Sequence, residues 1–384
     1  MKNNILTMFF LATAALAAGA CQESIQYADV VYFTGTENSP VTSMYVDGPS
    51  SMGITVTSSA KLSSEMTVDV EVNGAAVDAY NAAHGTAYKM LPEGSYKLSS
   101  SNLKIEAGKN VSLPVNFEIL SMDDFEEGVA YCAPLTITGT SNGMKVLEAS
   151  RTTYVLISQI ITTKGLETRG NNYVSFPSIT NNAMYHNMTA CTMEIRVYMN
   201  SFYSESSNPG IASVMGVEEN FLLRFGDISC KKNQLQYAGR GASVTSKSQF
   251  NTKQWYHLAV VDDGTNLVLY VDGEIEGQVA SSGKAAIDLA WDYMDGFHIG
   301  FSERGRLMDG IVSEARVWNR ALNAIELENN QCYVDPKSEG LIGYWRLDGL
   351  DENGKFVDMT GNGNHGTPNR APAWSGDIKC PVID

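Results

Sequence analysis

Four runs of sequence decide the fold: WYHLAVV at residues 255–261, LVLYVDG at 267–273, FHIG at 297–300 and MDGIVSEARVWNRAL at 308–322. They are rich in β-branched and aromatic residues, and Asp-Gly dipeptides lie in or beside them. Asp-Gly is a preferred turn between antiparallel strands. Short runs of this kind, separated by turn residues, are typical of a β-sandwich. We therefore predict an all-β fold.

The composition agrees with this class and limits the partners. The 384 residues suffice for about two or three domains. Lys and Arg total 27 against 43 Asp and Glu, a formal net charge of −16. An acidic surface repels nucleic-acid phosphates. We exclude nucleic acid as a partner for that reason.

The first 21 residues have the features of an export signal. Lys2 supplies a positive charge, and the apolar run at 5–18 is shorter than a membrane span. Small residues at 18–20 are followed at once by Cys21. We expect a lipoprotein signal peptide over 1–21 with Cys21 as the lipidated residue, and an outer-membrane protein that faces the cell exterior. Ordinary signal-peptidase cleavage after Ala20 is the alternative.

Five further cysteines are Cys132, Cys191, Cys230, Cys332 and Cys380. They lack the CxxC spacing of zinc sites. An exported chain can form disulfides, and Cys332 and Cys380 bracket the C-terminal segment, so these two could pair. The alternative is that all five are small buried residues.

The region 25–160 reads as a first β domain, which we predict to be an immunoglobulin-like sandwich. Apolar and polar residues alternate over 67–72 and 111–117, as they do in half-buried strands. One helix is predicted over 75–84, and Gly85 would end it. The polar stretch at 162–172 is predicted to be a linker or first loop.

The second domain is predicted over 170–384. Residues 192–199 alternate clearly, with Glu194 and Arg196 on one face. Asn323 and Glu326 form a capping pattern that opens a short helix. We infer that the segment from residue 341 onward adds strands to the same sandwich.

Two resemblances follow from these motifs. The run at 308–322, after the Trp-x-His strand and the Tyr-Val-Asp-Gly turn, resembles the laminin-G-like branch of the concanavalin A-type lectin/glucanase sandwich. This implies a jelly-roll sandwich that binds glycans or proteins and is only sometimes an enzyme. The segments DAYNAAHGTAY (78–88), LPEGSY (91–96) and IEAGK (105–109) are similar to uncharacterised N-terminal sandwich domains of Bacteroidetes cell-surface lipoproteins. Such a domain is expected to act as a spacer, with direct ligand binding as the alternative.

The Gly-rich loop near the C-terminus allows two interpretations. Its GxGxxG pattern at 361–366 is not followed by a helix, because Thr367 and Pro368 come next, so we reject dinucleotide binding. Asp358, Asn362 and Asn364 could supply oxygen ligands to Ca²⁺. The laminin-G-like resemblance also implies calcium loops of this sort. The alternative is that these side chains stabilise turns.

Catalytic carboxylates are not evident. Glucanases of the resembled fold carry Glu-x-Asp-x-x-Glu or a close variant on one strand, so that alternate carboxylates enter the cleft. No such run occurs here, and Glu194 is alone on its strand. His257 and His298 lie in predicted strands and are expected to be structural. The pair Asp262-Asp263 is interpreted as a solvated turn. We predict that the protein is not an enzyme.

Sugar sites combine exposed aromatic rings with planar polar groups. Candidate ligand-binding residues are Trp291 and Tyr293 in a predicted loop, Arg304 in the next loop and Trp374 in the Pro-rich tail. Trp255, Trp318 and Trp345 lie in strand patterns and are predicted to be core residues.

The function predicted from these features is a surface-anchored lipoprotein that binds a glycan or glycoprotein without altering it. The first alternative is a structural or adhesive subunit of an outer-membrane glycan-uptake complex. The second is a divergent glycoside hydrolase.

Overall fold

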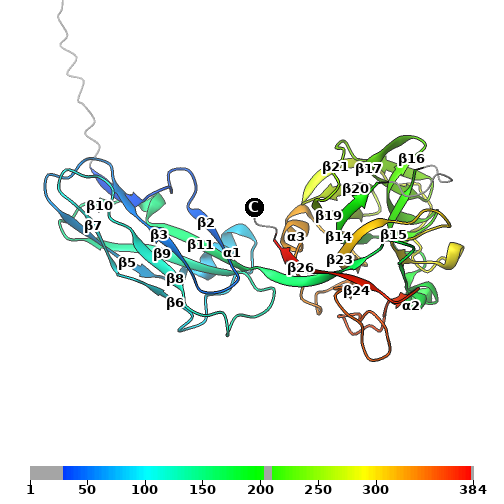
Figure 1. Ribbon diagram of the computed structural model, residues 1–384. Helices are drawn as coiled ribbons and strands as arrows, with labels where there is room; N and C mark the ends of the chain where they lie inside the picture. Colours follow the sequence, from blue (N-terminus) through cyan, green and yellow to red (C-terminus); the bar gives the residue numbers. More distant parts are fainter. Residues whose placement is uncertain (1–28, 203–209, 382–384) are drawn as a thin grey trace, which may run out of the picture.

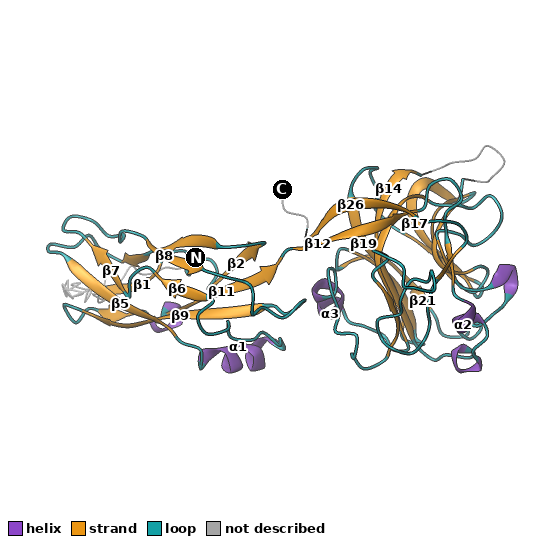
Figure 2. Ribbon diagram, turned by 60° about the horizontal axis from the view of Figure 1, so that its bottom comes forward, coloured by secondary structure: helices purple, strands orange, loops and turns teal. Residues whose placement is uncertain are grey.

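The computed structural model describes residues 29–202 and 210–381, so the predictions for residues 1–21, Cys21 included, lie outside it. Two β-sandwich domains lie end to end (Figures 1 and 2). The chain passes between them at Ile160, which separates strand β11 (Thr152–Gln159) from strand β12 (Ile161–Glu167). Within the described ranges, no helix is both long enough and apolar enough to cross a membrane.

The N-terminal domain has a five-stranded sheet on one side and two three-stranded sheets on the other. In spatial order the five-stranded sheet contains β2 (Val41–Val46), β11, β9 (Tyr131–Thr140), β5 (Met66–Val72) and β7 (Asn102–Ile105). The smaller sheets contain β10 (Lys145–Val146), β1 (Val30–Phe33) and β4 (Val56–Ser58), and β3 (Ser50–Ile54), β8 (Val115–Ile119) and β6 (Tyr96–Leu98). A 3-10 turn, η1 (Glu148–Ser150), precedes β11.

Strand alternation builds the core of this domain. In β5 the buried residues include Val68 and Val70, and they pack in one cluster with Phe33 and Phe117 from the opposite layer. The predicted helix is confirmed as α1 (Ala76–His84). Gly85 ends it with φ 66°, a left-handed conformation that glycine adopts without steric cost.

The C-terminal domain packs an eight-stranded sheet against a seven-stranded sheet. The first contains β21 (Glu274–Ala280), β20 (Asn266–Val271), β19 (Trp255–Asp262), β14 (Cys191–Ser201), β23 (Asp309–Trp318), β12 and β26 (Ala373–Cys380), with β24 (Leu341–Trp345) paired to β23. The second contains β18 (Ala242–Thr245), β17 (Cys230–Gly239), β16 (Phe221–Asp227), β15 (Ala212–Val217), β22 (His298–Ile299), β13 (Val174–Ser175) and β25 (Thr367–Pro368). The predicted all-β class is confirmed.

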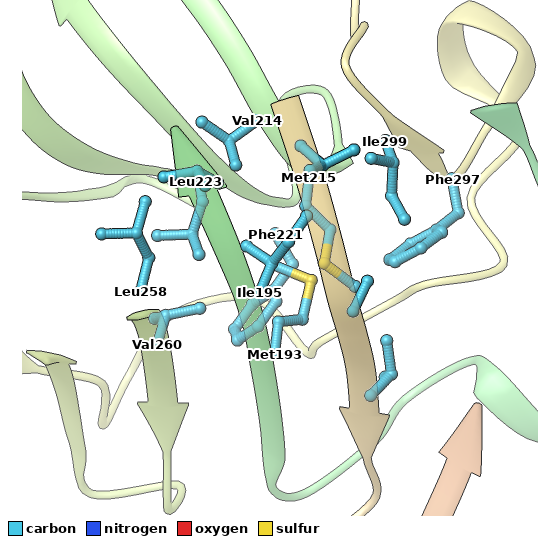
Figure 3. Packing of buried hydrophobic residues seen from close by; sticks show 14 of the residues in the cluster. Met193, Ile195, Val214, Met215, Phe221, Leu223, Leu258, Val260, Phe297 and Ile299 are labelled. Atoms are coloured by element: carbon cyan, nitrogen blue, oxygen red, sulfur yellow. The ribbon is translucent and has the colours of Figure 1, made fainter. Parts of the chain in front are cut away.

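Side chains from the two sheets meet in one continuous core (Figure 3). Met193 and Ile195 of β14 point inward, together with Val214 of β15 and Leu223 of β16. Trp345 is fully buried there, as predicted. The core holds the two sheets together, so the loops at the sandwich ends are the parts free to carry recognition residues.

The linker prediction for residues 162–172 is wrong over its first part. Residues Ile161–Glu167 form β12, which pairs with both β23 and β26. The exposed Thr162 and Lys164 give this strand a polar appearance, because only Gly165 and Leu166 are buried in it. The inference that the C-terminal segment completes the same sandwich is confirmed, since β24 pairs with β23 and β26 with β12.

The outer face of the eight-stranded sheet is covered by its own cap. The helix α3 (Ala324–Asn329) lies over it, and the predicted capping box between Asn323 and Glu326 is present. Trp318 and Leu327 pack in this second apolar layer. Short helical turns elsewhere are α2 (Pro177–Thr180), η2 (Ala183–Tyr185) and η3 (Tyr293–Asp295).

The Cys332–Cys380 disulfide is present and ties the segment after α3 to β26. Cys132, Cys191 and Cys230 are free. The interpretation of Asp262-Asp263 as a solvated turn is wrong for its first member. Asp262 is fully buried and pairs with Arg240, so burial of this charge is compensated by a buried partner.

Candidate functional site

An aromatic loop, defined as residues 288–297, forms the second part of the connection from β21 to β22. Trp291 and Tyr293 are 38% and 40% exposed, and their ring centroids lie 5.7 Å apart with a 39° angle between the planes. Met294 beside them is also 38% exposed. Large aromatic rings that remain this exposed present flat apolar faces to solvent. The loop therefore offers the kind of surface on which a sugar ring stacks.

Both ends of the aromatic loop are anchored in the fold. The backbone N–H of Leu289 donates to the carbonyl of Tyr185 at 3.1 Å, and the N–H of Phe297 donates to Thr180 Oγ1 at 3.2 Å. The side chains of Leu289 and Phe297 are fully buried. The exposed rings are thus carried by a segment that is fixed on either side.

The turn that presents these rings has an unusual backbone. Met294 and Asp295 have φ values of 52° and 67°, and Gly296 follows with φ 84°. A left-handed conformation at a non-glycine residue costs on the order of 1–3 kcal/mol, and such residues cluster at functional sites. A Cβ at Gly296 would lie 2.1 Å from Thr180 Oγ1, so only glycine fits against α2. This backbone is a second reason to place a binding site here.

A half-exposed polar pair lies at the base of the same loop. His186 Nδ1 is 2.8 Å from the carboxylate of Asp288, and the two side chains are 42% and 27% exposed. Asp288 is held in turn by its backbone N–H, which donates to Asn220 Oδ1 at 2.9 Å. Planar hydrogen-bonding groups beside aromatic rings are what a sugar hydroxyl edge requires.

Arg304 makes no contact with this loop that would join the two into one site. Arg304 lies on an exposed turn after the two-residue strand β22. Among the described residues, no hydrogen bond, ion pair or ring contact joins it to Trp291 or Tyr293. Trp374 is also elsewhere. It is half-buried in β26, its ring packs edge-on against Phe356 at 5.7 Å, and it lies against the hydrophobic core.

The Asp358 loop is built as a stabilised turn. Asp358 is only 2% exposed, and its carboxylate accepts hydrogen bonds from the backbone N–H groups of Tyr344, Thr360 and Asn364 and from the Thr360 hydroxyl. Asn362 directs its amide nitrogen to the carbonyls of residues 341 and 342. Calcium needs about six to eight oxygen ligands. These three side chains do not fit that requirement, because their oxygens are occupied or turned away.

The sequence matches known domain families over most of the described chain. Residues 168–328 match the family model of the concanavalin A-like lectin/glucanases superfamily. The C-terminal domain belongs to this superfamily. Residues 26–144 match the model of a separate family described as an N-terminal domain. No curated protein matches the sequence.

Solved structures include one that resembles both domains together. A candidate carbohydrate-binding protein from Bacteroides ovatus is 28% identical, with a TM-score of 0.59 over 90% of this chain and 97% of its own. A pentraxin from Limulus polyphemus is 12% identical, with a TM-score of 0.39 over 58% of this chain and 98% of its own. A second Bacteroides ovatus protein, of unknown function, is 11% identical, with a TM-score of 0.32 over 79% and 95%.

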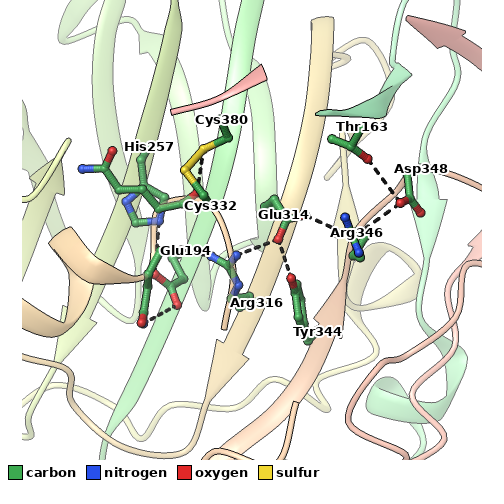
Figure 4. A network of polar contacts seen from close by, with 12 residues as sticks. Thr163, Glu194, His257, Glu314, Arg316, Cys332, Tyr344, Arg346, Asp348 and Cys380 are labelled. Atoms are coloured by element: carbon green, nitrogen blue, oxygen red, sulfur yellow. Dashed lines mark hydrogen bonds and ion pairs between the residues drawn. A yellow bond between two sulfur atoms is a disulfide. The ribbon is translucent and has the colours of Figure 1, made fainter. Parts of the chain in front are cut away.

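In the concanavalin A-like domain, the lone strand carboxylate Glu194 is withdrawn from solvent. It is fully buried and lies 3.1 Å from His257 Nε2 (Figure 4). It also accepts a hydrogen bond of 2.8 Å from the indole of Trp318. Burial alone would raise the pKa of Glu194, but the contact with His257 and the charge of Arg316 hold it below its usual value. His257 is structural, as predicted. Glu194 has no access to a substrate.

The same network continues along the outer face of the sheet. Glu314 accepts hydrogen bonds from Arg316 at 2.7 Å and from the hydroxyl of Tyr344 at 2.6 Å. Burial raises the pKa of Glu314 despite these partners. Within residues 29–202 and 210–381, no group of three or more His, Cys, Asp or Glu side chains could hold a metal ion.

Sequence reasoning missed a polar cluster on the seven-stranded sheet. Glu218 is 2% exposed, accepts a hydrogen bond from Arg306 at 2.7 Å and contacts the hydroxyl of Ser302. Arg224 lies beside them and is held by Gln236 at 2.9 Å. Its members come from four segments: the turn after β15, strands β16 and β17, and the loop after β22. No local sequence motif therefore predicts the cluster. The available signal is the presence of single polar residues, Ser213 and Arg224, inside the otherwise apolar strands β15 and β16.

Proposed function

We propose that this protein binds a glycan, free or on a glycoprotein, through its concanavalin A-like domain and does not cleave it. The observation that carries the proposal is the exposed Trp291–Tyr293 pair on an anchored, left-handed turn. His186 and Asp288 would hydrogen-bond sugar hydroxyls at the base of the loop. Stacking on the rings supplies affinity, and the polar pair supplies orientation.

The comparisons support the ligand class. Members of the matched superfamily are lectins and glucanases, and the Bacteroides ovatus candidate carbohydrate-binding protein resembles this chain over both domains. The absence of cleavage is supported by the burial of Glu194, which excludes the lone strand carboxylate as a catalytic acid.

The arrangement of the domains supports a display function at the cell surface. The aromatic loop and α2 lie at the end of the C-terminal domain that is far from the N-terminal domain (Figures 1 and 2, with η3 in yellow in Figure 1). With a lipid on Cys21, the N-terminal domain would lift this end away from the outer membrane. We propose that it acts as a spacer for an outer-membrane lipoprotein that faces the exterior.

The test compares Trp291→Ala with Ile228→Ala, which removes an 88% exposed apolar side chain on a different turn. A glycan array with the wild-type protein selects the ligand, and calorimetry measures its affinity. Loss of the stacking ring should raise the Kd at least about tenfold, or about 1.4 kcal/mol, whereas Ile228→Ala should bind like the wild type. The proposal fails if Trp291→Ala keeps full affinity or if the wild type releases reducing sugar. Capture of protein partners from membranes without any sugar binding would favour a role as a subunit of a glycan-uptake complex.

A further inference from the structure

A cavity in the described part of the chain is lined by residues of both domains. Its volume is about 630 Å³, within the range of about 300–1,000 Å³ typical of ligand pockets. A smaller cavity of about 250 Å³ shares Gln159 and Ile161 with it. The residues that matter for its chemistry are Tyr45 and Tyr88 from the N-terminal domain and Glu328, Asn329, Gln331 and Tyr333 from the C-terminal domain. We name this space the junction cavity.

The walls of the junction cavity are held together across the domain boundary. Arg346 pairs with Glu127 at 2.6 Å. Tyr333 packs so closely on Gly128 that a Cβ at Gly128 would lie 1.8 Å from its ring. Only Ile160 separates β11 from β12, which limits how far the domains can move apart. These contacts across the domain boundary therefore hold the walls of the cavity in place.

Its lining includes three tyrosine rings and three side-chain amides, beside several aliphatic residues. Tyr45 is 47% exposed on β2. Tyr45, Tyr88 and Glu328 all line this cavity. Burial raises the pKa of Tyr88, and the nearby Cys132, Glu328 and Tyr45 raise it further. Gln331 and Asn329 add amide donors and acceptors from the opposite wall. Rings with amides and hydroxyls match a ligand that has apolar faces and hydroxyl edges.

The charges of the lining select against an anionic ligand. Lys89 is already paired with Glu126 at 2.6 Å. Arg346, in the adjoining cavity, is surrounded by the carboxylates of Glu127, Glu314 and Asp348. A carboxylated or sulfated ligand would find no uncompensated cation among these residues. A neutral ligand is favoured for that reason.

We propose that the junction cavity is a second carbohydrate-binding site, which takes a neutral oligosaccharide between the two domains. It shares the ligand class of the proposed function but uses different residues. Occupation of both sites by one long glycan, or by two chains of the same glycoconjugate, would increase the overall affinity through effective concentration. Binding at the junction would also stiffen the two-domain unit, because the ligand contacts both halves.

Hydrogen-exchange mass spectrometry of the full chain tests the proposal. The probes are neutral hexaoses of glucose, mannose, xylose and arabinose at millimolar concentration. We expect at least one of them to slow exchange in residues 86–89 and 328–333. The Trp291→Ala variant should show the same protection in these residues. In Tyr45→Ala, the sugar concentration that gives half-maximal protection should rise at least tenfold. Tyr45 is exposed, so its truncation leaves the fold intact.

Two variants complete the design. Tyr32→Ala removes a tyrosine from β1, outside the cavity, and should leave protection unchanged. Asn329→Ala removes an exposed amide from the wall and should weaken protection as Tyr45→Ala does. Protection of 288–296 without any at the junction overturns this inference alone. Protection at the junction only would overturn the proposed function instead, and none at either place would overturn both.

Discussion

The amide nitrogen of Asn364 donates a hydrogen bond of 2.9 Å to the hydroxyl of Tyr185, which is 179 residues earlier in the chain. The backbone carbonyl of Tyr185 accepts the N–H of Leu289 at the start of the aromatic loop. Both side chains of the pair are buried. The Asp358 loop and the aromatic loop, which the sequence suggested as separate sites, are therefore joined through one tyrosine.

We expect Tyr185→Phe to weaken both stability and binding. The change removes the acceptor of Asn364, which keeps only the carbonyl of Ile342 as a partner for its amide nitrogen. The free energy of unfolding should fall by about 1 kcal/mol, and the ligand Kd should rise severalfold because the loop is less well held. Urea unfolding and calorimetry measure the two effects. Tyr256→Phe is a matched control, since its hydroxyl accepts the N–H of Asn251 at 3.0 Å away from the aromatic loop. An equal effect of both variants on binding would contradict the proposed link.

Asp358→Asn should destabilise the C-terminal domain without any dependence on calcium. The carboxylate accepts four hydrogen bonds, and the new amide group would direct N–H groups at some of those donors. We expect a loss of roughly 1–3 kcal/mol in the free energy of unfolding. Thermal unfolding in Ca²⁺ and in chelator should give the same difference between variant and wild type. A rise in the wild-type Tm on adding Ca²⁺ would instead support a metal site at this loop.

Removal of the Cys332–Cys380 disulfide should lower the free energy of unfolding by an amount that depends on the length of the loop it closes. The sequence separation is 48 residues, which corresponds to about 4 kcal/mol in the chain-entropy description. All five tryptophans lie between residues 255 and 374, so tryptophan fluorescence follows this domain alone. The double change Cys332→Ser with Cys380→Ser should shift the urea midpoint, as should reduction of the wild type. Cys230→Ser, at a free half-buried cysteine, is the control and should shift it little.

His298 should make stability fall as the pH is lowered. Burial lowers its pKa, and its Nδ1 is 2.9 Å from the carbonyl of Gly296 in the aromatic loop. Below about pH 6.5 the unfolded chain takes up a proton that the folded chain still refuses, so stability is lost as the pH falls towards the folded pKa. His298→Asn keeps a donor but does not titrate. Its unfolding free energy should therefore fall less than that of the wild type between about pH 7.5 and pH 5. If the unfolding free energies of the variant and the wild type fall equally over this pH range, His298 is not the group responsible.

Local sequence patterns predicted those parts of the fold that depend on neighbouring residues. Helix α1 was predicted from spacing and Gly85, and α3 from the Asn323–Glu326 box, because capping acts within a single turn. Strand β14 was evident because its apolar residues alternate. Strand β12 was missed because its exposed polar residues and Gly165 resemble a linker until β23 and β26 are placed on either side.

Burial and exposure that depend on residues far apart in the chain could not be predicted from local sequence patterns. Asp262 is buried because Arg240, 22 residues away, lies against it. Trp291 and Tyr293 were correctly predicted to lie in a loop, since Asp and Gly residues surround them, but their exposure depends on how α2 and η2 hold the loop ends. Trp374 looked equally available, yet β12 holds β26 so that its ring packs against Phe356.

The single-residue connection at Ile160 determines where the chain can be divided. A fragment that starts at residue 170, at the end of the expected linker, would lack β12 and leave β23 and β26 without their shared neighbour. Unpaired strand edges of that kind invite aggregation. A recombinant lectin-like half must therefore begin no later than Ile161, even though those first residues look dispensable.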